Sequence, residues 1–214
     1  MEETAVDAAG AKPLEPLLHR FTALESKRDL AAFLAHQQLA TYGSGWLFGF
    51  GSDQDFSDAT KVIAFARAGG LGLPDRDYYT KNDARSKDLR DKYVAHVARM
   101  LELAGESNAE AAKDAATVMS IETALAKASL TRVQRRDPYN LFHKMTPAEL
   151  QKITPSFDWK RHLAATGLHN VKMINVTEPG FFKEMQREIK SASLADWKAY
   201  LRWHAVHAQA PYQG

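Results

Sequence analysis

The stretch GLGLPDRDYYTK, from Gly70 to Lys81, holds two glycines, a proline and two adjacent tyrosines within twelve residues. Gly70 and Gly72 can adopt backbone angles that other residues resist, and Pro74 fixes its own φ angle. Pro74 also biases Leu73 toward extended backbone, so that Asp75 can start a turn. These residues predict a structural corner that joins two regular elements.

The second half of the stretch is charged and aromatic. Arg76 and Asp77 are expected to bond to one another or to neighbouring backbone. Tyr78 and Tyr79 are expected to face different sides, one inward and one toward a partner surface. Nothing in this chemistry makes a nucleophile.

Outward from this corner, apolar residues recur at helical spacing. They predict helices at about residues 14–21 and 30–39, joined by the charged turn ESKRD, and a third helix at about residues 84–104 that Gly105 ends. The stripe of the second helix includes Leu39. A last helix is predicted to begin at Ser193 and to run past residue 203.

Two capping boxes mark further helix starts. Ser107 with Glu110 opens a fourth helix, and Thr146 with Glu149 opens a short one that has proline at its first position. Aromatic and β-branched residues at 46–50 and 62–65 predict a β-hairpin whose polar residues 51–60 form a long loop, and residues 171–176 predict a second extended piece. The expected fold is mainly α, a multi-helix domain with a small β-hairpin near residues 46–65. At 214 residues, with 45% hydrophobic content, we expect one domain over 1–214.

Composition excludes several classes of function. A net charge of +2 lacks the basic field that nucleic acid requires, and no apolar run is long enough to span a membrane. The chain has no cysteine, which excludes disulfides and thiolate metal sites.

Standard catalytic motifs are missing from the sequence. None of the eight histidines is followed by glutamate, as a zinc-hydrolase helix requires, and neither a phosphate loop nor a GxSxG elbow is present. His204 and His207 have a spacing that permits shared metal binding, but no third ligand is evident, and packing histidines are the favoured interpretation. The many carboxylates are interpreted as solvated faces that pair with basic neighbours. We therefore predict no catalytic and no metal-binding residue in this chain.

The segment GLGLPDRDYY resembles a block of the neprilysin-like zinc metallopeptidases, the family of neprilysin, endothelin-converting enzymes and many bacterial oligopeptidases. The resemblance also takes in WLFGFGSDQDFSDATKVI before it, IETALAKASLTRVQRRDPYNLFHKMTPAELQKI after it, and TPSFDW at residues 154–159. These blocks occur in order between about Leu14 and Trp203.

The resemblance implies that the chain is the amino-terminal helical cap domain of a larger two-domain peptidase. The family's zinc site, with HExxH and a downstream ExxxD, lies in the carboxy-terminal part, so its residues would fall beyond Gly214. The chain alone is then expected to be inactive and to carry no cofactor, with zinc in the missing catalytic domain. Its expected partners are that catalytic domain and the peptide substrates of the parent enzyme. The resemblance favours a periplasmic or extracellular location.

The motif residues that the resemblance singles out are expected to hold the scaffold rather than to touch peptide. They are Gly72, Pro74, Arg76, Asp77, Tyr78, Tyr79, Arg136, Asp137 and Pro138. Some family members have a specificity arginine before the glycine that matches Gly10, where this sequence has Ala9. Two alternatives stay open: a stand-alone helical module that binds peptides or a protein without cleaving them, and an independent hydrolase that uses His204 and His207.

Overall fold

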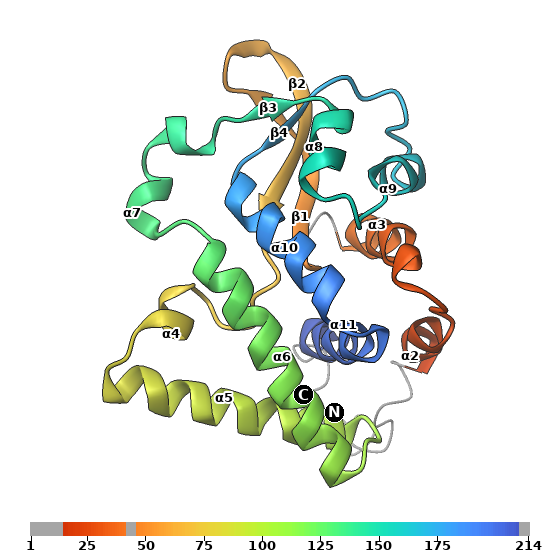
Figure 1. Cartoon of the computed structure of the whole chain (residues 1–214), viewed down its shortest axis with the longest axis vertical. Coiled ribbons are helices and arrows are strands. Elements are labelled where there is room, and N and C mark those ends of the chain that lie inside the picture. The colour runs from red at the N-terminus through yellow and green to blue at the C-terminus, as the bar shows by residue number, and fades with distance from the viewer. Residues whose placement is uncertain (1–14, 42–45, 210–214) are drawn as a thin grey trace, which may run out of the picture. The chain divides into compact units, whose positions relative to one another are not determined.

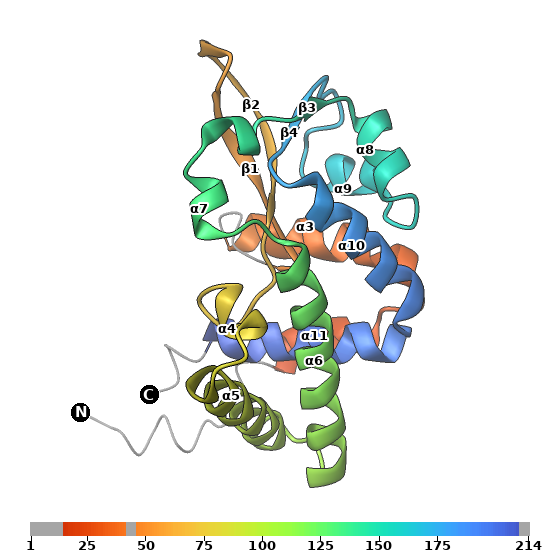
Figure 2. The ribbon, with the colours of Figure 1, turned by 60° about the vertical axis from the view of Figure 1, so that its left-hand side comes forward.

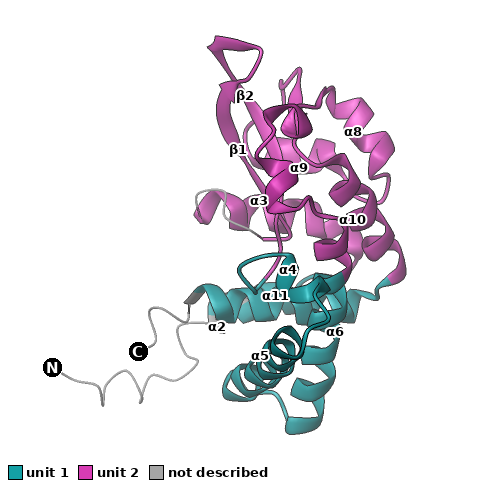
Figure 3. Ribbon diagram, turned by 90° about the vertical axis from the view of Figure 1, so that its left-hand side faces the viewer, with its two compact units in different colours: residues 1–25, 72–123, 192–214 teal, residues 26–71, 124–191 magenta. Residues whose placement is uncertain are grey.

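The computed structural model describes residues 15–41 and 46–209. The chain forms two compact units, which Figure 3 distinguishes by colour. Unit 1 takes its described residues from 1–25, 72–123 and 192–214, and unit 2 takes its own from 26–71 and 124–191. Each unit is therefore assembled from segments that are far apart in the sequence.

Unit 1 is helical. Its helices are α2 (Glu15–Thr22), α4 (Asp77–Thr80), α5 (Ala84–Leu103), most of α6 (Asn108–Ala128) and α11 (Leu194–Gln209). Apolar side chains of α5 and α6 pack with Trp203 of α11 to form its core. The buried members are Tyr93, Val97, Leu101, Ala111, Ala115, Val118 and Trp203.

The ends of the long helices in unit 1 follow from local sequence. The Asp83 side chain caps α5 by accepting the backbone N–H of Ser86, and Gly105 ends the helix with a φ of 103°. Ser107 and Glu110 form the expected capping box before α6, with the Ser107 N–H donating to the Glu110 carboxyl at 3.1 Å. The predicted bounds of both helix starts are confirmed.

Unit 2 combines a small sheet with short helices (Figure 1). The sheet has the order β1-β2-β4-β3, where β1–β2 and β4–β3 are antiparallel and β2–β4 is parallel. Its strands are β1 (Phe48–Asp55), β2 (Asp58–Ala68), β3 (Lys144–Met145) and β4 (Ile174–Val176). Its helices are η2 (Lys27–Asp29), α3 (Leu30–Ala40), α7 (Arg132–Arg135), η3 (Pro138–Leu141), α8 (Pro147–Ile153), α9 (Trp159–Ala165) and α10 (Pro179–Ser191). The mainly α fold with a β-hairpin is confirmed.

The hairpin differs from the prediction in one respect. The polar residues expected to form a long loop instead continue the ladder to Asp55 and Asp58, so the turn between the strands is short. Only three residues of β2, 64–66, also pair with β4, and Figure 2 shows the hairpin extending beyond β3 and β4. Residues 52–54 of β1 and 59–62 of β2 are exposed on both faces, which explains why this part of the sequence is mostly polar.

The core of unit 2 is aromatic. The Phe48 ring lies 5.2–5.7 Å, between centroids, from four other rings. These belong to Phe157, Trp159, His162 and Phe182. Leu39, by contrast, is 54% exposed, so its assignment to an apolar core stripe was wrong. No helix in the described part of the chain is both long and apolar enough for a membrane span.

Candidate functional site

The sequence corner at Gly70–Lys81 leads into a buried polar cluster of unit 1. Tyr79 is the buried member of the tyrosine pair, and Tyr78 is only partly buried. The Tyr79 hydroxyl donates to Glu122 Oε2 at 2.6 Å and accepts the backbone N–H of Leu73 at 2.9 Å. The loop is thus closed on itself and fastened to α6 by one side chain.

Glu122 is the centre of this cluster and is fully buried. Besides Tyr79, it accepts the Tyr93 hydroxyl, 2.9 Å from Oε2, and His204 Nε2 lies 3.0 Å from Oε1. The Trp203 indole N–H donates to the Tyr93 hydroxyl at 2.9 Å. We call these five residues, Tyr79, Tyr93, Glu122, Trp203 and His204, the Glu122 network. It joins α4, α5, α6 and α11.

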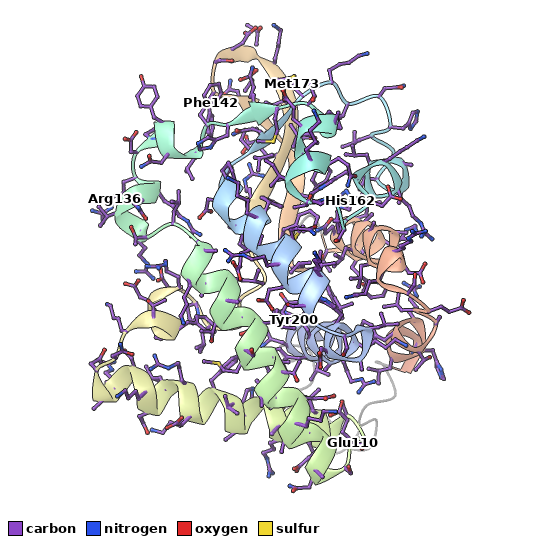
Figure 4. The ribbon with its side chains drawn as sticks, viewed as in Figure 1. Glu110, Arg136, Phe142, His162, Met173 and Tyr200 are labelled. Carbon is purple, nitrogen blue, oxygen red and sulfur yellow. The ribbon has the colours of Figure 1, made fainter. Side chains whose placement is uncertain are left out.

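The electrostatics of the network keep its hydroxyls protonated. Burial, and then the nearby Glu122 carboxyl, raise the pKa of Tyr79 and of Tyr93 well above the ordinary tyrosine value. Burial acts in the same direction on the pKa of Tyr200 on α11 (Figure 4). The ring centroid of Tyr200 lies 4.4 Å from that of His204. The Tyr79 and Tyr93 hydroxyls therefore serve as hydrogen-bond donors. The network stabilises unit 1 rather than supplying a nucleophile.

Gly72 is required by close packing against this network. A Cβ at this position would lie 1.9 Å from the Tyr93 hydroxyl oxygen and 3.2 Å from the indole nitrogen of Trp203. Both groups are held by hydrogen bonds, so neither can move away freely. Any side chain at residue 72 must therefore disturb the network.

The charged residues of the same motif stay near the surface of unit 1. Pro74 is exposed, and the Asp75 side chain accepts the Asp77 N–H at 2.8 Å, as a turn requires. Arg76 and Asp77 form the expected pair, at 3.7 Å, while the Tyr78 carbonyl accepts from Arg90 at 2.8 Å. These contacts are local, and the role of the motif as scaffold remains a proposal.

The second motif, Arg136–Pro138, is exposed in unit 2. The Asp137 side chain caps η3 by accepting the Tyr139 N–H at 3.0 Å, with Pro138 at the first position of that helix. Figure 4 shows Arg136 on the outer side of α7. This motif and the first one lie in different units.

The described residues do not form a zinc site. No group of three or more His, Asp or Glu side chains suited to a metal ion occurs within residues 15–41 and 46–209. His204 Nε2 faces Glu122, whose oxygens already accept two hydroxyl donors. His207 instead stacks on Trp203, with centroids 5.1 Å apart. The interpretation of this pair as packing histidines agrees with these contacts, and Ala9 and Gly10 lie outside the described residues.

Sequence reasoning missed Glu122, and the interpretation of the carboxylates as solvated is wrong there. It is also wrong for Asp55 and Glu178, which are 3% and 5% exposed. A signal was present, because Val118, Glu122 and Leu125 share one helical face at the spacing i, i+4, i+7. A charged residue inside an apolar stripe indicates a buried partner, which only the tertiary fold identifies.

Unit 2 buries a histidine in a different way. His162 is fully buried, its Nε2 lies 2.7 Å from Gln38 Oε1, and the Gln38 amide in turn donates to the Phe48 carbonyl at 2.9 Å. Because that amide nitrogen is committed to a carbonyl, Oε1 is the atom that faces His162, and Nε2 is the protonated nitrogen. Burial lowers the pKa of His162 to about 3, so the ring is neutral.

The whole sequence, residues 1–214, matches the model for the amino-terminal region of "Peptidase family M13". The chain belongs to peptidase family M13. Human endothelin-converting enzyme 1 is 25% identical over 99% of this chain and 29% of its own length. Neprilysin-3 of Drosophila melanogaster is 23% identical over 94% of this chain and 28% of its own length.

A solved M13 relative shares the fold. The zinc metalloprotease ZMP1 of Mycobacterium tuberculosis, in complex with an inhibitor, superposes with a TM-score of 0.88 and 31% identity. The superposition covers 99% of this chain and 32% of that protein. The chain is thus the amino-terminal region of an M13 peptidase and spans about a third or less of the length of these relatives.

Proposed function

We propose that this chain is the non-catalytic helical domain that roofs the active-site cavity of an M13 zinc metalloendopeptidase and restricts substrates to oligopeptides. The observation that carries the proposal is the extent of the ZMP1 match, which takes in nearly all of this chain but only 32% of the protease. A region of that size is available for a role other than bond cleavage.

The chemistry of the described residues supports the same assignment. The Glu122 network is internally satisfied and holds four helices together. Zinc, which polarises a carbonyl or activates water when bound, would lie in the catalytic domain, the partner of this chain. A roof over such a site would exclude folded proteins by size and keep bulk water from the reacting carbonyl.

The test measures hydrolysis by the full polypeptide whose reading frame contains these residues. Its rates on a short fluorogenic peptide, on a long unstructured peptide and on a folded protein are compared. We expect rapid cleavage of the short peptide, slow cleavage of the long one and none of the folded protein. Comparable rates on all three would contradict the size restriction.

A second measurement covers the case in which the enzyme cleaves unfolded chains of any length. The same peptides are assayed after residues 1–214 are cross-linked to the remainder of the polypeptide through an introduced cysteine pair. If these residues form a roof, cross-linking in the closed state must suppress cleavage, and reduction must restore it. Unchanged cleavage would show that residues 1–214 do not control access of substrate to the active site.

A further inference from the structure

Strand β1 lies at one edge of the sheet in unit 2, because the strand order is β1-β2-β4-β3. On an edge strand, alternate residues direct their backbone N–H and C=O away from the sheet. Which residues of β1 do so follows from two hydrogen bonds.

The first hydrogen bond is on the far side of β2. The Ala66 carbonyl accepts the Thr177 N–H at 3.0 Å, so it points toward β4 and away from β1. Ala66 stands opposite Phe50 in the antiparallel register, and that pair is therefore not joined by hydrogen bonds. It follows that the N–H and C=O of Phe50 point to the open edge.

The second hydrogen bond gives the same alternation. The Phe48 carbonyl accepts the Gln38 amide at 2.9 Å, so it too points away from β2. Two residues further along the strand from Phe50, Ser52 must share this orientation. Within the described part of the chain, no hydrogen bond occupies these outward groups of Phe50 and Ser52.

On either side of Phe50 and Ser52, backbone groups of β1 already have hydrogen-bond partners. At Phe48 the carbonyl is taken by Gln38, and beyond Ser52 the Gln54 N–H bonds to the Asp53 side chain at 2.8 Å. Between them, the strand offers two N–H and two C=O groups. These four groups can pair with a short peptide segment in extended conformation.

A hollow lies beside the same residues. It has a volume of about 350 Å³ and no charged side chain lines it. The residues that line it are Gln38, Leu39, Phe50, Gly51, Ser52, Thr166 and Leu168. Leu39 is 54% exposed at its rim, and a Cβ at Gly51 would meet no atom within 4 Å.

We propose that this β1 edge binds an extended peptide segment, which adds to the sheet as a further strand and places one apolar side chain in the hollow. Outward backbone N–H and C=O groups select an extended backbone, whereas a helix has no free partners to offer. The uncharged lining selects an apolar side chain over a charged one. The inference rests on the proposed function, since it names the class of oligopeptide segment that the domain would hold.

The test uses the 214-residue chain and a fluorescein-labelled peptide that alternates threonine with valine around one central leucine. Fluorescence anisotropy gives the affinity for wild type, Ser52→Pro and Ser52→Thr. Because the Ser52 N–H points outward, proline there removes no β1–β2 hydrogen bond. Threonine keeps the N–H and serves as the matched control. Leu39→Asp provides a second variant, at an exposed position, that places a charge at the hollow.

We expect Ser52→Pro and Leu39→Asp each to weaken binding by about tenfold or more, and Ser52→Thr to leave it unchanged. Peptides N-methylated at alternate residues must bind weakly in one register and normally in the other, because only one set of N–H groups faces β1. Equal binding of all variants, or indifference to N-methylation, would overturn the proposal.

A second copy of the chain is the competing occupant of the edge. Sedimentation that showed a dimer broken by Ser52→Pro, with no peptide bound, would also overturn the proposal. The peptide assay requires no hydrolysis, so its failure leaves the size restriction of the full polypeptide to be judged by its own experiment. Conversely, if the 214-residue chain binds the peptide but the full polypeptide shows no size restriction, the edge site stands and the proposed size restriction is wrong.

Discussion

Unit 1 and unit 2 each bury a histidine, and they satisfy it by opposite means. His204 in unit 1 faces a carboxyl that also accepts two tyrosine hydroxyls. His162 in unit 2 lies among aromatic rings and has a single amide oxygen as its partner. The two units are therefore sensitive to different changes. The Glu122 network in unit 1 is destabilised when a hydrogen-bond partner is removed, whereas the aromatic core of unit 2 is destabilised when His162 is protonated.

The largest effect is expected from breaking the unit 1 network at its centre. Glu122→Ala leaves two buried hydroxyls and His204 without their acceptor, and we expect unfolding free energy to fall by about 3–5 kcal/mol. Urea denaturation followed by circular dichroism measures it. Lys127→Ala, on the exposed face of the same helix, is the control and should change stability by less than about 0.5 kcal/mol. A loss for Glu122→Ala no larger than the control's would show that the network is not stabilising.

The next effect tests close packing in unit 1 against open space in unit 2. Gly72→Ala places a Cβ against the Tyr93 hydroxyl, and we expect a loss of about 1–3 kcal/mol from overpacking. Gly51→Ala meets no atom within 4 Å and should instead stabilise by up to about 1 kcal/mol, because alanine restricts the unfolded chain. The same denaturation measures both. If the two substitutions had equal effects, the contact with Tyr93 would not explain why residue 72 is glycine.

Acid should act on unit 2 through His162. Burial lowers its pKa in the folded state from 6.5 to about 3, so between these values the unfolded chain binds more protons than the folded chain. Stability therefore falls as pH decreases through 6.5, and this histidine contributes a loss of about 2 kcal/mol between pH 7 and pH 5.

The control for that prediction is His162→Gln, whose amide can still donate to Gln38 but does not titrate. Denaturation at several pH values should give a shallower fall for the variant than for wild type across this range. Parallel curves would mean that the buried ring is not the group responsible.

The smallest effect concerns the exposed motif of unit 2. Asp137→Ala removes the side-chain cap of η3, and we expect a loss of about 0.5–1 kcal/mol, while Asp137→Asn retains the cap. This contrasts with the motif of unit 1, whose Tyr79 is buried. Thermal denaturation of wild type, Asp137→Ala and Asp137→Asn measures these changes. A loss of stability as large as that for Glu122→Ala would contradict the view that Asp137 only caps η3.

Local features of the fold were predictable because they depend on neighbouring residues. The capping boxes at Ser107 and Thr146 and the helix end at Gly105 were each confirmed where the sequence placed them. The hairpin was predicted, but its loop was too long, because strand residues exposed on both faces have the composition of a loop.

Tertiary features were not predictable in the same way. Glu122 is separated from Tyr79 by 43 residues and from Tyr93 by 29 residues in the sequence. No local sequence pattern predicts that these side chains form hydrogen bonds. Whether the backbone groups of Phe50 and Ser52 point to the open edge depends on the register of β1 against β2, which only the fold fixes. The scaffold role of the motif residues stays a prediction, and the sequence could not separate the buried Tyr79 from the exposed Arg136.

The most direct test of the central claim is the nucleotide sequence that follows the codon for Gly214. If the chain is the amino-terminal domain of an M13 zinc peptidase, the frame stays open and encodes HExxH and then ExxxD. A stop codon at that point would contradict the account and make the chain a stand-alone binding module.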